Sequence, residues 1–131
     1  MELLTDELRS ALLRTGKLTQ ECQIAGKDEP DFEPVVKFFT PDANCTWLLT
    51  EIDPDDPDIA FGLCDLGMGC PELGSVSLSE LKSVRGCLGL PIERDLYFDA
   101  SFSLSVYAQA ARCAQCITEE PKALERAGGA S

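Results

Sequence analysis

The stretch "VVKFFTPDANCTWLLTEIDPDDPDIAFGLC" (residues 35–64) decides the fold of this chain. In three runs of this stretch, successive side chains alternate between two faces, and this period of two predicts β-strands. The runs are residues 35–39, 46–52 and 58–64. The segments between the runs contain proline, aspartate and asparagine, which are typical of turns. Strands joined by short turns favour an antiparallel meander. We therefore expect a sheet at the centre of the fold.

A helix is predicted before this region. Residues 3–16 place apolar side chains at helical spacing, Thr5 can cap the first turn, and Gly16 is the expected end of the helix. The polar residues 17–33 that follow carry a weak signal and include a predicted loop, "KDEPDFEP".

Two further helices are expected after the meander. Ser77 and Glu80 form a capping box, which predicts a helix of about two turns that ends near Gly86. The alanine-rich residues 103–117 predict the last helix, and Pro121 begins an expected frayed tail.

Residues 90–98 ("LPIERDLYF") predict another strand. Strand alternation places Arg94 on the apolar face, and a buried guanidinium needs a carboxylate and further acceptors. Glu72 and Glu80 are the expected partners. Arg94 is interpreted either as part of a structural ion pair or as a ligand-binding residue.

These elements together predict an α+β fold. We expect an antiparallel sheet of about four or five strands, with an N-terminal helix, a short middle helix and a C-terminal helix. With 131 residues, 44% of them hydrophobic, the chain suits one domain, expected over residues 1–118, with a disordered tail at 119–131. Four side chains are expected to be buried in the core: Trp47, Phe61, Leu81 and Leu96.

The net charge of −12 is concentrated in one part of the chain. Residues 28–72 contain twelve acids and a single base, Lys37. Such a negative field repels nucleic acid and anionic lipid, and it attracts a basic protein. The acids considered as candidates for binding such a partner are Asp53, Asp55, Asp56, Asp58, Asp65 and Glu72.

The loop "DPDDPD" (residues 53–58) has three interpretations: a solvated turn, part of an acidic recognition surface, or a metal site. Calcium loops use glycine to fold back around the ion, whereas Pro54 and Pro57 direct this chain outward. We therefore expect an exposed turn between two antiparallel strands, with its four carboxylates in water and no bound ion.

Histidine is absent, which excludes Ser-His-Asp and Cys-His catalysis and mixed His/Cys metal sites. No phosphate-binding glycine motif is present either. We therefore expect a non-enzymatic protein, with a carboxylate-dependent enzyme as a minor alternative.

The seven cysteines have two interpretations. Cys113 and Cys116 form a CxxC pair and, with Cys64 and Cys70 or with Cys87, could hold zinc as the only expected cofactor. Alternatively, they are small apolar side chains. The chain has no apolar run long enough to span a membrane and begins with acidic residues, so a cytoplasmic location with reduced thiols is expected.

Three segments, "VVKFFTPDANCTWLLTEID", "DIAFGLCDLGMGCPELGSVSLSEL" and "VRGCLGLPIERDLYF", resemble the bacterial family catalogued as domain of unknown function 2958. The resemblance extends from about Leu3 to Cys116. It implies a small protein of plasmids and integrated mobile elements, encoded near conjugation and plasmid-maintenance genes. It implies no catalytic residue or cofactor.

The charge and the implied genomic setting together suggest an acidic decoy. In this hypothesis the carboxylates imitate nucleic acid and occupy the basic groove of a host nuclease, restriction enzyme or CRISPR effector, which gives antirestriction or anti-CRISPR activity. The alternative hypothesis is a small-ligand or zinc-binding domain that uses Arg94 and the cysteines.

Overall fold

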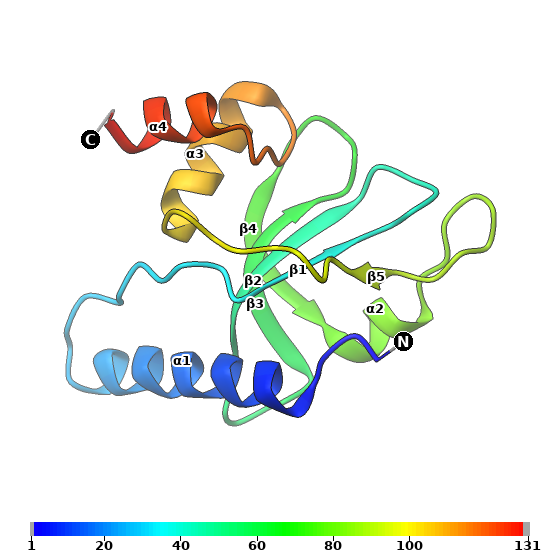
Figure 1. Cartoon of the computed structure of the whole chain (residues 1–131). Coiled ribbons are helices and arrows are strands. Elements are labelled where there is room, and N and C mark those ends of the chain that lie inside the picture. Colours follow the sequence, from blue (N-terminus) through cyan, green and yellow to red (C-terminus); the bar gives the residue numbers. More distant parts are fainter. Residues whose placement is uncertain (1, 130–131) are drawn as a thin grey trace.

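The computed structural model describes residues 2–129 and has the predicted α+β fold (Figure 1). A five-stranded antiparallel sheet is combined with four helices in this part of the chain. The strands are β1 (Val36–Phe39), β2 (Thr46–Ile52), β3 (Ile59–Asp65), β4 (Glu72–Ser77) and β5 (Glu93–Arg94). The helices are α1 (Asp6–Ile24), α2 (Leu78–Ser83), α3 (Leu104–Ala114) and α4 (Pro121–Gly129).

The strand order is β4-β3-β2-β1-β5, and each pair of neighbours is antiparallel. Strands β1, β2 and β3 form the meander that the sequence predicts. Strand β4 extends it beyond the three strands predicted there. Strand β5 returns to the opposite edge, where Arg94 pairs with Phe38.

Helices cover both faces of the sheet (Figure 1). Alternate side chains of a strand point to opposite faces, so each face buries its own apolar cluster. On the α1 and α2 face, Leu12 of α1 packs in one cluster with Phe38 and Leu49. On the other face, Leu48 and Leu63 pack with residues of α3 and with Leu124 of α4.

Helix α1 does not end at Gly16 as predicted, but continues to Ile24. Gly16 is buried against strand β2, and a Cβ atom at this position would lie 1.9 Å from the carbonyl oxygen of Ile52. Close packing of α1 on β2, rather than helix termination, therefore requires this glycine.

Two of the four core predictions are confirmed, because Trp47 and Leu81 are buried. Phe61 is only partly buried beside the α3 cluster. The prediction for Leu96 is wrong, since this side chain is 60% exposed. Strand β5 ends at Arg94, and the chain then turns at Asp95, whose carboxylate accepts a hydrogen bond from the Tyr97 N–H. Strand alternation therefore does not extend to Leu96.

The prediction of a disordered tail is also wrong, because Pro121 begins helix α4. Proline suits the first helical position, where its missing N–H has no partner to lose. Leu124 of α4 is buried against α3. Only residues 130 and 131 of the expected tail lie outside the described residues.

The capping prediction for α2 is confirmed at its start. Ser77 Oγ accepts a hydrogen bond from the Glu80 N–H at 3.2 Å. The helix ends at Ser83, before the predicted Gly86. Within residues 2–129, no helix is long and apolar enough to cross a membrane.

Candidate functional site

Eight of the twelve acids of residues 28–72 fall into two groups of four, and the first group holds the fold together. Asp65 is 3% exposed, and its two carboxylate oxygens accept hydrogen bonds from the N–H groups of Gly67 and Ile117, each at 2.9 Å. It ties the end of β3 to the segment after α3. Asp65 is therefore buried and satisfied, and its predicted role in contacting a partner is wrong.

Asp42 and Asp31 also belong to this first group. Asp42 Oδ2 accepts hydrogen bonds from the N–H groups of Leu88 (2.7 Å) and Leu90 (3.2 Å), which anchors the loop before β5. Asp31 accepts from the N–H and the hydroxyl of Ser105 in the first turn of α3. Both carboxylates join segments that are far apart in the sequence.

Asp58 completes this group and corrects the prediction that all four loop aspartates stand free in water. Its carboxylate accepts hydrogen bonds from the hydroxyls of Ser77 (2.6 Å) and Ser79 (2.9 Å) and from the Ser79 N–H (2.9 Å). The Ser77 hydroxyl is the largest cause that lowers the pKa of Asp58, followed by the two bonds from Ser79. Asp58 therefore ties the loop to the start of α2.

The rest of the 53–58 loop is the predicted exposed turn between antiparallel strands β2 and β3. The Asp53 carboxylate accepts from the Asp55 N–H at 2.9 Å, and the Asp56 carboxylate accepts from the Asp58 N–H at 3.3 Å. These local bonds form Asx turns, which fix the direction of the loop backbone. Aspartate supplies both the charge and the turn geometry here.

The second group of acids lines a groove of about 460 Å³ beside the C-terminal half of α1. We call it the acidic groove and define it by four carboxylates: Glu29, Glu51, Asp53 and Asp55. Glu51 comes from strand β2, the two aspartates come from the loop after it, and Glu29 comes from the segment after α1.

Helix α1 provides a hydrogen-bond donor to three of these four carboxylates. Thr19 Oγ1 donates to Glu51 Oε1 at 3.2 Å, and Gln20 Nε2 donates to Asp55 Oδ2 at 2.7 Å. The third donor is Gln23 Nε2, which bonds to Glu29 Oε1 at 2.5 Å. Residues three or four apart lie on one side of a helix, so these donors face the groove together. Glu29, Glu51 and Asp55 are therefore held in place by neutral side chains.

The pKa of Glu51 shows that the groove carboxylates influence one another. Partial burial is the main cause that raises this pKa, and the bond from Thr19 opposes it. The charges of Glu29 and Asp53 raise it further. Within residues 2–129, both ion pairs shorter than 4.0 Å belong to Lys37, so no lysine or arginine pairs with the groove.

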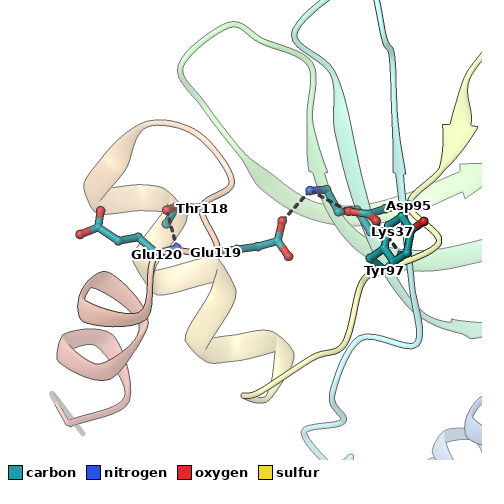
Figure 2. A network of polar contacts seen from close by, with 6 residues as sticks. All are labelled: Lys37, Asp95, Tyr97, Thr118, Glu119 and Glu120. Atoms are coloured by element: carbon teal, nitrogen blue, oxygen red, sulfur yellow. Dashed lines mark hydrogen bonds and ion pairs between the residues drawn. The ribbon is translucent and has the colours of Figure 1, made fainter.

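Lys37, the single base of residues 28–72, is engaged elsewhere. Figure 2 shows its ammonium group between two carboxylates, at 3.5 Å from Asp95 and 2.5 Å from Glu119. Its neighbour Phe38 packs in the cluster on the α1 face, so alternation along β1 directs Lys37 to the face of α3 and α4. Lys37 therefore leaves the charge of the acidic groove uncompensated.

The prediction that Arg94 contacts the carboxylate of Glu72 or Glu80 is wrong. Arg94 Nη1 donates to the backbone carbonyls of Glu2 and Leu3, each at 2.8 Å. Glu72 at the start of β4 and Glu80 in α2 are both exposed. The segment before α1 has free carbonyl groups that satisfy the guanidinium, so no buried acid is needed.

The structure does not assemble the proposed zinc set. Cys64 is partly buried on the α1 face, where desolvation raises the pKa of its thiol. Cys113 and Cys116 are exposed at the end of α3, which covers the opposite face, and Cys70 is exposed in the β3–β4 turn. In the described part of the chain, no group of three or more Cys, Asp or Glu residues is arranged to hold a metal ion.

The acidic groove as a whole was not foreseen. Asp53 and Asp55 are predicted binding residues, but Glu29 and Glu51 are not, and the donors Thr19, Gln20 and Gln23 lie in residues 17–33, where the sequence carries a weak signal. The polar spacing of these three residues was the available signal, and the interpretation of Gly16 as the helix end concealed it.

Fold and site together define an α+β protein with fixed carboxylates around an uncompensated groove. The chain belongs to the family described as a protein of unknown function, DUF2958, whose sequence model matches residues 3–118. This match confirms the resemblance found in the sequence. No curated protein and no solved structure matches the chain.

Proposed function

We propose that this protein binds a basic protein partner through the acidic groove. The observation that carries this proposal is the absence of any lysine or arginine paired with the four groove carboxylates within residues 2–129. Neighbouring negative charges disfavour the ionised form of a carboxylate. A cation that a partner brings close stabilises this ionised form. A partner arginine can bind a carboxylate through two parallel hydrogen bonds, which gives direction as well as attraction.

The partner in this proposal is a nucleic-acid-binding protein of the bacterial host. The groove carboxylates and the exposed Asp56 imitate a short row of phosphates, and they occupy the basic groove of a nuclease, restriction enzyme or CRISPR effector. The mobile-element setting that the family resemblance implies supports this choice, because such elements benefit from blocking host defence. The protein then acts as a decoy with antirestriction or anti-CRISPR activity.

A matched pair of variants tests whether the groove itself binds. The groove variant is Glu29→Gln, Glu51→Gln, Asp53→Asn and Asp55→Asn. The control variant removes the same charge from four exposed acids outside the groove, through Glu7→Gln, Glu80→Gln, Asp99→Asn and Glu125→Gln. Isothermal titration with an arginine-rich peptide should give clearly weaker binding for the groove variant and near wild-type binding for the control.

The natural partner is then sought in a lysate of a bacterial host. Capture should be strong at about 0.05 M salt and weak at about 0.5 M, because salt screens exposed charges. A purified partner should lose its nuclease activity when the wild-type protein is added. It should keep that activity when the groove variant is added instead. Equal effects of both variants would show that net charge alone, rather than the groove, causes binding.

The zinc or small-ligand alternative based on Arg94 and the cysteines stays a prediction. Metal analysis of the purified protein tests it, since stoichiometric zinc would favour this alternative over the decoy.

A further inference from the structure

A second cavity, of about 780 Å³, lies at the N-terminal end of helix α1. Figure 1 shows the start of α1, helix α2 and strand β5 gathered at this end of the sheet. The cavity lining includes Leu3, Leu4 and Ile92, whose side chains are buried. Its volume falls within the range of pockets that bind small molecules.

Three cations line this cavity in a protein that has only eleven lysines and arginines. Arg9 comes from α1, Lys82 from α2, and Arg85 from the segment after α2. Within residues 2–129, both ion pairs shorter than 4.0 Å belong to Lys37. None of these three cations therefore lies that close to a carboxylate. Each of these unpaired cations can attract an anionic group, while an equal number of carboxylates in the lining leaves the cavity without net charge.

One of these cations is held in place by the protein itself. Arg85 Nη1 donates to the carbonyls of Lys82 (3.0 Å) and Val84 (2.8 Å) at the end of α2. The guanidinium has further N–H groups that remain available to a ligand.

The walls of the cavity are fixed by contacts from outside it. Arg94 holds the carbonyls of Glu2 and Leu3, which belong to the segment before α1. Asp42 accepts hydrogen bonds from the N–H groups of Leu88 and Leu90, and Leu90 is itself part of the lining. A cavity whose walls are already ordered loses little entropy when a ligand binds.

We propose that this cavity binds a small organic anion with an apolar body. The body lies on Leu3, Leu4 and Ile92, and its single carboxylate, sulfonate or phosphate group faces the three cations. The same cavity is lined by Glu2, Asp6 and Glu93, which repel a ligand that is charged over its whole length. These acids accept hydrogen bonds from N–H or O–H groups on the ligand body.

Two fluorescent probes that share one apolar body test this proposal on the full chain. 1-Anilinonaphthalene-8-sulfonate carries an anionic group, and N-phenyl-1-naphthylamine is its neutral counterpart. The wild-type protein should bind the sulfonate saturably at one site and the neutral probe more weakly. Backbone amide shifts in NMR spectra should map the sulfonate to Arg9, Lys82 and Arg85.

The cavity variant is Arg9→Gln, Lys82→Gln and Arg85→Gln. It should weaken binding of the sulfonate by about tenfold or more, because charge-assisted hydrogen bonds are lost, and change binding of the neutral probe by less than about twofold. The control is Arg14→Gln, Lys27→Gln and Lys122→Gln, three exposed cations outside the cavity. The single variant Arg9→Gln repeats the test with the smallest disturbance of the fold.

Three results would overturn the proposal: no saturable binding of the sulfonate by the wild-type protein, equal affinity for both probes, or an equal loss in the cavity and control variants. Equal affinity would indicate an apolar patch without an anion site. An equal loss would indicate that the effect follows net charge.

Discussion

In the loops around Asp42, Asp58 and Asp65, carboxylates accept hydrogen bonds from backbone N–H groups of distant segments. In the acidic groove, by contrast, carboxylates meet neutral side chains of α1 and the charges of one another. Both regions draw their acids from residues 28–72. The donors around a carboxylate, rather than the local density of charge, therefore decide whether an acid stabilises the fold or remains available to a partner.

The largest effect is expected at Asp65, on the structural side of this comparison. Asp65→Ala leaves the N–H groups of Gly67 and Ile117 without their buried acceptor, which should lower the free energy of unfolding by about 3 kcal/mol. Urea unfolding monitored by Trp47 fluorescence measures the loss. Asp28→Ala, at an exposed position without a bonded partner, should change stability by less than about 0.5 kcal/mol. Equal stability of the two variants would contradict the structural role of Asp65.

A smaller and more local effect is expected at Asp42. Asp42→Ala removes the acceptor of two N–H groups in an exposed loop, which should cost about 1–2 kcal/mol. Hydrogen exchange at the amides of Leu88 and Leu90 should become faster, while exchange in strand β2 should change little. Unchanged protection at these two amides would contradict the anchoring role.

At Asp58 the test is a dependence on pH. Hydrogen bonds from Ser77 and Ser79 lower its pKa below the ordinary value of 3.8 in the folded state, so the ionised form stabilises the fold. This contribution is complete above the unfolded-state pKa and is lost as pH falls through the lower folded-state pKa. Asp58→Asn should therefore be less stable than the wild type at pH 7, and the difference should shrink in strong acid. A difference that stays constant with pH would contradict this assignment.

The smallest effect, with the opposite sign, is expected in the acidic groove. Partial burial raises the pKa of Glu51 above 4.5, so the ionised form destabilises the fold. The cost is complete above the folded-state pKa and disappears as pH falls below the unfolded-state value. Glu51→Gln should therefore stabilise the protein at pH 7 by less than about 1 kcal/mol, because the side chain is partly exposed. Denaturant midpoints at pH 7 and pH 4 measure this gain, with Glu33→Gln as control. A loss of stability at pH 7 would contradict it.

The sequence predicted the meander because its signals are local. Alternating side chains define strands β1, β2 and β3, and the prolines and asparagine between them define the turns. The Ser77 cap was also predicted, since the cap and its partner lie three residues apart. Each of these features depends on neighbours in the chain.

The features that the sequence did not predict depend on distant segments. Gly16 was interpreted as a stop because its contact with Ile52 is not visible in the sequence, and Pro121 was interpreted as an end although it begins α4. The partners of Arg94 are backbone carbonyls, which leave no mark in a sequence. Asp53 and Asp55 of the groove were predicted as binding residues, but Glu29, Glu51, the hydrogen-bond donors of α1 and the cavity with three cations were not.

The order of the strands has a consequence for the way in which the protein folds. Strands β1 to β4 are joined by successive hairpins, whose contacts are close in sequence and form early. Strand β5 reaches β1 through α2 and a long loop, so we expect it to pair late, together with the bond from Arg94 to the segment before α1. We expect this end of the molecule to close last and to open first. A ligand bound there would therefore slow unfolding by stabilising the final step of folding.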